Sequence, residues 1–296
     1  MKFLPEIFVA SEEGMVLSLL WLSQDGSRRD CWKIDEIIIN PETDSSLAVT
    51  KQLLQYGLSQ LGAQGVETFL AYLDVSSTDG INLMKECGFR RCTRSMSWRL
   101  EASDLGIIER QEDIEKQLKQ VGLREATGWD IKQLQSLYED SLPPEIRVSL
   151  RRLPTELHPS LDRQFLERCK GSFHKAWVLP HSSQQYLLAY VSIHSHDFRE
   201  FKLQVIVSPG YDHDLESIVW FGLNQIYKNG SKITVNIDSY EFQKTLQAVI
   251  ETAQFQLTAQ TEILVKDVFV PMSNQGNKLT SPILLFGKQD GKTSPA

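Results

Sequence analysis

The 296-residue sequence has few of the features that mark a specialised protein class. Its four cysteines, Cys31, Cys87, Cys92 and Cys169, have no paired spacing and form no CxxC motif, which argues against a zinc or redox centre and favours a reduced intracellular protein. The longest nearly apolar run, residues 15–22, is far too short to span a membrane. The N-terminal residues have no long apolar stretch and soon turn acidic, which argues against a signal peptide. We therefore predict a cytoplasmic protein without membrane insertion.

An excess of basic residues is also absent. The net charge is −7, from 31 Lys and Arg against 38 Asp and Glu, and neither half of the chain carries a basic stripe. A nucleic-acid partner is therefore not expected. The acidic first half could attract a basic peptide or a polyamine, or it could only provide a soluble surface. No GxGxxG, P-loop or GxSxG motif occurs, so the sequence does not indicate dinucleotide, P-loop or α/β-hydrolase chemistry.

The residues that are present predict a globular α/β protein. An apolar content of 41% suffices for sizeable cores, and the length suits two domains. Strands and helices alternate along the first 100 residues, and turn signals such as Asp25-Gly26 separate them. The predicted strands cover residues 8–10, 15–22, 32–39, 66–72 and 93–97, and the predicted helices cover residues 47–61 and 81–87.

A similar order of elements recurs later in the chain. It begins at residue 122 with a short strand, a helix from Asp130 and an irregular helical region over residues 147–170, and the first half lacks these opening elements. The sequence thus predicts an N-terminal unit at 1–100, a linker with a short helix at 101–121, a C-terminal unit at 122–287 and a disordered tail at 288–296. The later strands cover 176–179, 186–193, 201–207, 233–237 and 263–269, and the later helices cover 215–226 and 242–253.

The order strand, helix, strand, helix, Gly-Phe, strand resembles the acyl-CoA-binding half of the GNAT superfamily, the acyl-CoA N-acyltransferases. Gly88-Phe89 in the first half corresponds to Gln254-Phe255 in the second, and the strand Ile34–Ile39 corresponds to Phe201–Val207. The resemblance implies an α/β (α+β) fold of two GNAT-like domains, each with a central mixed sheet flanked by helices. The two domains are expected to pack sheet to sheet or edge to edge.

The resemblance also implies a site for acetyl-CoA. In this family the fourth strand ends at a bulge and separates from its neighbour, and the next helix presents its free N–H groups to the pyrophosphate. The resemblance places this site in the first half and carries it over to the following residues: Ile39, Ser45, Ser46, Leu47 and Ala48.

This chain departs from the family's Arg/Gln-x-x-Gly-x-Gly/Ala motif. Asp44 stands where Arg or Gln is usual, and Leu47 and Val49 replace the glycines; Asp212 and Leu215 hold the matching positions of the second half. A carboxylate within several Å of the pyrophosphate would cost about 1 kcal/mol or more. Asp44, and Asp214 beside the matching positions of the second half, could instead be ordinary helix N-caps. We therefore predict weak acetyl-CoA binding, in the high micromolar range or beyond.

The general base that the resemblance implies is Glu36, a glutamate on the fourth strand. A carboxylate there could deprotonate an amine through water, although Glu36 could also be only an exposed strand residue. The second half has Gln204 at this position, and Met84 and Ile250 stand where the family has a tyrosine acid. His194 and His196 could suit a metal, but a polar turn is the favoured interpretation and no metal site is predicted.

Two functions remain open at this point. The first is acyl-CoA-dependent transfer of an acetyl group to an amine, with a small amine or a basic protein as the substrate. The second is a catalytically inactive tandem GNAT-like module that binds a protein partner or senses acyl-CoA. The retained Glu36 favours the first function, and the missing glycines favour the second.

Overall fold

The computed structural model describes residues 4–42, 46–101, 118–119, 122–157, 172–181, 186–228 and 233–268. The predicted tail, the predicted linker apart from residues 101 and 118–119, and Ser45 lie outside the described residues. We call residues 4–101 the first half and residues 122–268 the second half. None of the described helices is long and apolar enough to cross a membrane.

The first half follows the predicted alternation of strands and helices. Leu54, Leu58 and Leu61 recur at helical spacing and are buried against the sheet, which is why this segment forms a helix. At the end of the second helix, Gly88 adopts φ +88°, a left-handed conformation that suits glycine, and buried Phe89 follows. The elements are β1 (Glu6–Glu12), β2 (Met15–Gln24), β3 (Cys31–Ile39), α1 (Ser46–Ala63), β4 (Thr68–Asp74), α2 (Thr78–Glu86) and β5 (Arg90–Glu101).

The second half repeats this order after opening elements of its own. These are β6 (Arg124–Glu125), the 3-10 helix η3 (Gly128–Asp130), α4 (Ile131–Ser141), α5 (Pro144–Arg147) and α6 (Pro154–Leu157). The predicted irregular helical region over residues 147–170 is interrupted at residues 148–153, which form turns and irregular backbone, and residues 158–170 lie outside the described residues. The repeated elements are β7 (Phe173–Pro180), β8 (Leu187–Ser195), β9 (Glu200–Val207), α8 (Leu215–Tyr227), β10 (Thr234–Tyr240), α9 (Lys244–Thr252) and β11 (Gln256–Asp267).

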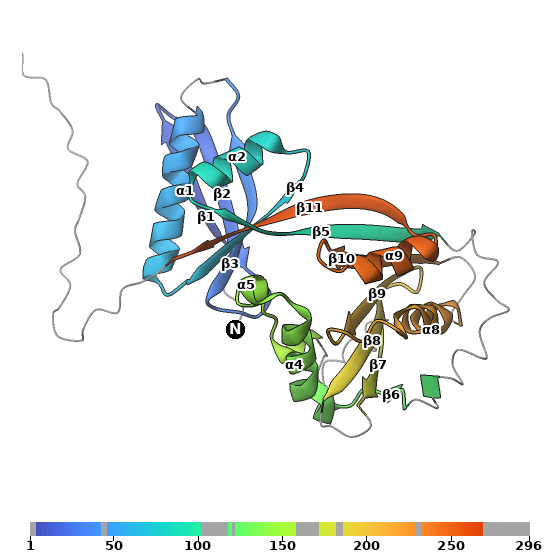
Figure 1. The fold of residues 1–296 in the computed structure, drawn as a ribbon. Coiled ribbons are helices and arrows are strands. Elements are labelled where there is room, and N and C mark those ends of the chain that lie inside the picture. The colour runs from blue at the N-terminus through green and yellow to red at the C-terminus, as the bar shows by residue number, and fades with distance from the viewer. Residues whose placement is uncertain are drawn as a thin grey trace, which may run out of the picture.

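All the described strands belong to one continuous 11-stranded sheet with the order β1-β2-β3-β4-β11-β5-β10-β9-β8-β7-β6. The last strand of each half is inserted into the other half: β11 pairs with β4, and β5 pairs with β10. These two strands are also antiparallel partners of each other and cross the middle of the molecule (Figure 1). The two halves therefore share one sheet and do not meet in a simple sheet-to-sheet or edge-to-edge contact, because each half contributes a strand to the sheet of the other.

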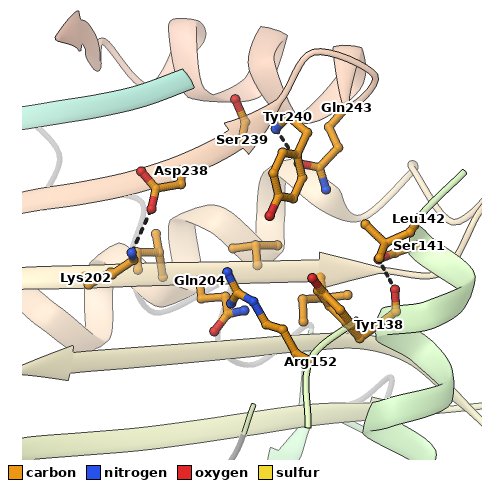
Figure 2. A pocket seen from close by; sticks show the side chains of 13 residues that line it. Tyr138, Ser141, Leu142, Arg152, Lys202, Gln204, Asp238, Ser239, Tyr240 and Gln243 are labelled. Atoms are coloured by element: carbon orange, nitrogen blue, oxygen red, sulfur yellow. Dashed lines mark hydrogen bonds and ion pairs between the residues drawn. The ribbon is translucent and has the colours of Figure 1, made fainter. Parts of the chain in front are cut away.

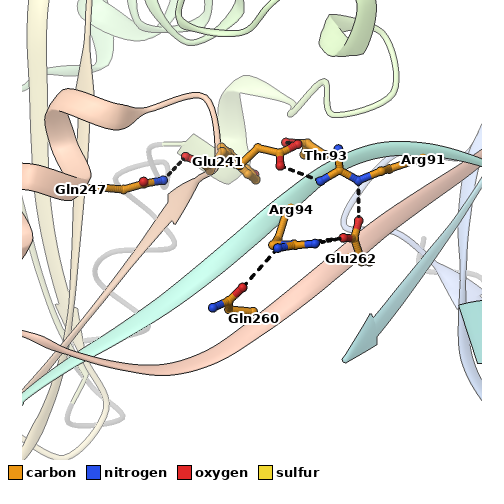
Figure 3. A network of polar contacts seen from close by, with 8 residues as sticks. Arg91, Thr93, Arg94, Glu241, Gln247, Gln260 and Glu262 are labelled. Carbon is orange, nitrogen blue, oxygen red and sulfur yellow. Dashed lines mark hydrogen bonds and ion pairs between the residues drawn. The ribbon is translucent and has the colours of Figure 1, made fainter. Parts of the chain in front are cut away.

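A polar network reinforces this exchange of strands (Figure 3). The buried Glu262 of β11 accepts hydrogen bonds from Arg91 Nε at 2.8 Å and from Arg94 Nε at 3.0 Å, both on β5. Arg91 also donates to Glu241, at 2.6 Å, in the turn after β10. The charges of the two arginines are thus compensated by Glu262 from β11 and by Glu241 from the turn after β10, and the network connects β5 to both neighbouring strands.

The helices cover the two halves of the sheet unequally. In the second half, α8 and α9 cover one face and α4, α5 and α6 cover the other, which creates a hydrophobic core on each side. In the first half, α1 and α2 cover one face, and Ser18 of β2 bonds to Thr50 of α1 on that side. The opposite face of β1–β3 exposes Ile7, Trp21 and Ile38. No described helix of the first half covers this face.

Candidate functional site

Strands β3 and β4 separate near the predicted base of the first half. Their parallel pairing extends only from Cys31–Thr68 to Ile34–Ala71, although both strands continue beyond it. At the same point β3 contains a bulge: Trp21 pairs with Glu36 and Leu22 pairs with Ile34, so Asp35 has no partner on β2. A bulge re-aims the side chains that follow it. Glu36 is exposed, on the sheet face opposite α1.

The predicted coenzyme residues lie just beyond this opening. Ile39 ends β3 and is half-buried, Ser46 begins α1, and Leu47 and Ala48 are exposed in the first turn of that helix. The described first turn of α1 contains no acidic residue. The structure therefore brings these residues to one end of the splayed strands, where the first-turn amides of α1 face outward. Asp44 and Ser45 lie outside the described residues.

The second half has a related opening without the bulge. Strands β9 and β10 pair in parallel only from Glu200–Thr234 to Leu203–Ile237, and the register between β8 and β9 is regular through Gln204. Beyond the paired region lies a cavity of about 80 Å³ (Figure 2). Its polar lining residues include Tyr138, Arg152, Gln204, Tyr240 and Gln243.

A second cavity of about 220 Å³ lies next to the first, at the beginning of α8. The two cavities share Ser141, Val205 and Gln243 as lining residues. Asp214 occupies the N-cap position of α8 but makes no capping hydrogen bond with its side chain. It instead accepts a 2.5 Å hydrogen bond from the Tyr211 hydroxyl. Asp214 is thus the N-cap residue of α8 by position, but its side chain does not cap the helix.

Arg152 reaches the smaller cavity from an irregular segment that the first half holds in place. The buried Arg28, in the turn between β2 and β3, donates from Nη1 to the carbonyl oxygens of Val148, Ser149 and Arg151 at 3.2 to 3.3 Å. The three accepting carbonyls lie within the four residues before Arg152. The geometry of this segment is therefore set by a residue more than 100 positions away.

Tyr138 holds the same segment from the other side. Its hydroxyl donates a 2.7 Å hydrogen bond to the carbonyl of Leu150, and its ring lies 5.7 Å from the guanidinium carbon of Arg152. Burial is the main cause that raises the pKa of Tyr138, so the phenol is neutral and cannot serve as a base at neutral pH. Sequence reasoning missed both residues, because their only signal was a tyrosine and an arginine within a region predicted to be helical.

Other candidate residues do not assemble into reactive sites. Burial raises the pKa of the Cys31 thiol to about 12 and that of Cys92 to about 11, so neither thiol is a ready nucleophile. His194 and His196 lie beside a turn in which Asp197 accepts the amides of Arg199 and Glu200. Within the described residues, no group of three or more His, Cys, Asp or Glu is placed to hold a metal ion.

Comparison with known proteins identifies the fold. The chain is similar to a tandem GNAT protein from the clavulanic acid biosynthesis pathway, with 13% identity, a TM-score of 0.50 and coverage of 89% of this chain and 83% of that one. It is also similar to a GCN5-related N-acetyltransferase from Sphaerobacter thermophilus, with 14% identity, a TM-score of 0.52 and coverage of 88% and 80%. No protein-family model matches the sequence, and no curated protein matches it.

The chain therefore has a tandem GNAT fold, as the order of its elements predicted. At 13% and 14% identity the likeness establishes the fold and leaves the chemistry to be argued from the residues themselves. A functionally unknown conserved protein from Staphylococcus epidermidis has the same degree of similarity, with 11% identity, a TM-score of 0.50 and coverage of 81% and 85%.

Proposed function

We propose that this protein transfers an acetyl group from acetyl-CoA to an amine, and that its first half carries the chemistry. The bulge at Asp35, together with the separation of β3 from β4, is the observation that supports this proposal. The two strands stop pairing next to an exposed carboxylate, Glu36. The second half lacks the bulge and has an amide, Gln204, which cannot accept a proton from an amine.

The residues of the first half suit this coenzyme in part. The splayed strands offer backbone groups to an extended pantetheine arm, and the amides at the start of α1 offer an anion site for the pyrophosphate. Leu47 and Val49 place Cβ atoms where the family has glycine or another small residue, which supports our expectation of high-micromolar affinity. When bound, acetyl-CoA supplies the activated acyl group.

Glu36 would take the proton of the acceptor amine, directly or through one water molecule. Met84 holds the position of the family's usual acid and is buried in the core between α2 and the sheet. The leaving thiolate would thus receive its proton from water, which predicts slow turnover. The open face around Glu36 has room for a small amine or for a lysine on a basic protein.

The experiment is calorimetric titration of acetyl-CoA into the full chain, followed by transfer assays with spermidine and a lysine-rich peptide. Glu36→Gln should abolish transfer and change the free energy of unfolding by less than about 1 kcal/mol, since the side chain is exposed. Asp35→Asn is the matched control, because this neighbouring carboxylate is paired with Lys33 at 2.7 Å and should be dispensable. Full turnover by Glu36→Gln would disprove the assignment. Gln204→Glu should add no activity.

A specific observation also supports the second candidate, an inactive module that binds a protein partner. The uncovered face of the first half exposes Ile7, Val9 and Ile38 at 50–53%, and Trp21 lies among them through its pairing with Ile7. An apolar sheet face of this kind is typical of an interaction surface. Absence of acetyl-CoA binding by a folded protein at millimolar concentration would favour this candidate.

A further inference from the structure

Arg152 lines the 80 Å³ cavity of the second half, and nothing in the proposed function uses it. It is in contact with no described carboxylate. The other residues that line the cavity have aromatic, amide, hydroxyl and apolar side chains, apart from Lys202 and Asp238, which pair with each other at 2.7 Å. Figure 2 shows the side chain extending toward Gln204, with Tyr138 beside it. An arginine remains charged at any physiological pH, so a cation without a contacting anion in a cavity indicates that an anion binds there.

Two carboxylates lie near enough to interact electrostatically with Arg152, but the structure gives both other environments. Glu156 accepts hydrogen bonds from the backbone amides of Ser27 and Leu153, the latter at 3.1 Å. Asp25 lies in the turn after β2, where burial and the nearby Glu156 raise its pKa. Neither forms an ion pair with the guanidinium. They provide a weakly negative background that would disfavour a doubly charged ligand.

The remaining walls fit a small, flat anion. The side chains of Gln204, Gln243 and Tyr240 offer hydrogen-bond donors, and Leu142 and Ile206 provide apolar surface. The space is several times what one water molecule needs, which suits an acid of two to four carbon atoms. Through Ser141, Val205 and Gln243 it continues into the 220 Å³ cavity at the start of α8, so a larger group attached to the acid could extend there.

We propose that the second half binds the carboxylate of a small organic acid, with Arg152 as the residue that recognises it. The planar guanidinium pairs with a carboxylate through two parallel hydrogen bonds, a geometry that a lysine does not offer. Arg28 is a positioning residue for this site, because it fixes the segment that precedes Arg152. The site does not involve Glu36, and it can exist whether or not the first half transfers acyl groups.

The test is calorimetric titration of acetate, propionate and inorganic phosphate into the full chain at pH 7. Acetate or propionate should bind with a Kd in the millimolar range, and phosphate should bind more weakly because of Asp25 and Glu156. Arg152→Gln should weaken carboxylate binding at least tenfold, and Arg152→Lys should give an intermediate loss. Arg151→Gln is the matched control, since that neighbour is exposed and pairs with Glu139 at 3.5 Å; its affinity should stay within about twofold of the wild type.

Comparing malonyl-CoA with acetyl-CoA separates two sources of the carboxylate. An Arg152-dependent gain for malonyl-CoA over both acetyl-CoA and free malonate would assign it to the acyl group of a thioester. Binding of the free acids without such a gain would assign it to a free metabolite. The proposal is overturned if no carboxylate binds in an Arg152-dependent way, if Arg151→Gln loses binding equally, or if phosphate binds and the acids do not. Should Arg152→Gln fail to fold, Arg152→Lys decides. Glu36→Gln should leave carboxylate binding unchanged, so failure of this site and failure of the proposed catalysis are distinct results.

Discussion

Replacing Asp130 by asparagine should destabilise the protein in a way that depends on pH. Asp130 joins β6 to the start of α4: its Oδ1 accepts from Arg124 Nη2 at 2.6 Å, and its Oδ2 accepts from Arg124 Nη1 and the Thr127 amide, both at 2.8 Å. The side chain is 6% exposed. The hydrogen bonds from Arg124 are the main reason that the pKa of Asp130 falls from 3.8 to about 2, and those from Thr127 add to the effect.

This lowered pKa corresponds to about 2 kcal/mol of folding free energy at pH 7. Because the folded pKa lies below the unfolded one, the contribution is fully present above about pH 5 and is lost as the pH falls toward 2. Asp130→Asn should thus lower the free energy of unfolding by about 2 kcal/mol at pH 7 and by about half as much at pH 3.

Urea denaturation of both proteins at pH 7 and pH 3 measures this difference. Asp140→Asn on the same helix is the control: its carboxylate is 63% exposed, lies 3.8 Å from Arg147 and should contribute less than about 0.5 kcal/mol. A difference for Asp130→Asn that is below about 0.5 kcal/mol at pH 7, or that is the same at both pH values, would refute the reasoning.

Three further predictions concern the strand exchange and the junction of the halves. Gln254 has φ +63° in an exposed position equivalent to Gly88 of the first half. Gln254→Gly should therefore raise the free energy of unfolding, measured by urea denaturation, by about 0.5–1 kcal/mol. A lower free energy of unfolding in this variant would contradict the prediction. Glu262→Gln should lower the free energy of unfolding by about 2 kcal/mol at pH 7, because two arginines lose their shared buried carboxylate. The loss should be smaller below about pH 4, because burial raises the pKa of Glu262 but the two arginines lower it further, so that the folded pKa lies below the usual value. Asp267→Asn, which breaks an exposed pair, should cost under about 1 kcal/mol in the same urea assay. Arg28→Ala should lower the free energy of unfolding by about 3 kcal/mol and also weaken acetate binding, since three carbonyls lose their donor. Thermal unfolding measures the first effect and acetate titration the second. Unchanged acetate affinity would show that Arg28 does not position Arg152.

The amino-acid sequence by itself determined the elements of this protein and their order. Apolar segments bounded by turn signals in β1–β3, leucines at helical spacing in α1 and Gly88-Phe89 after α2 are local signals, each contained within about 20 residues. Two copies of the same order predicted a tandem GNAT fold, and the comparisons confirm it. The roles of Glu36 and of the coenzyme residues at the start of α1 stay predictions, because no ligand or activity bears on them.

Only the tertiary structure decided which strands pair and which residues meet. The patterns of β5 and β11 predict strands, but their pairing joins residues more than 150 positions apart, and strand periodicity carries no information about the partner. Arg152 enters its cavity because Arg28, over 100 residues earlier, holds the preceding carbonyls. A carboxylate, a guanidinium or a bulge becomes a candidate site only through neighbours that distant parts of the chain supply. Glu36 was predicted because its place in the order of elements resembles a known family, whereas no local pattern marks Arg152.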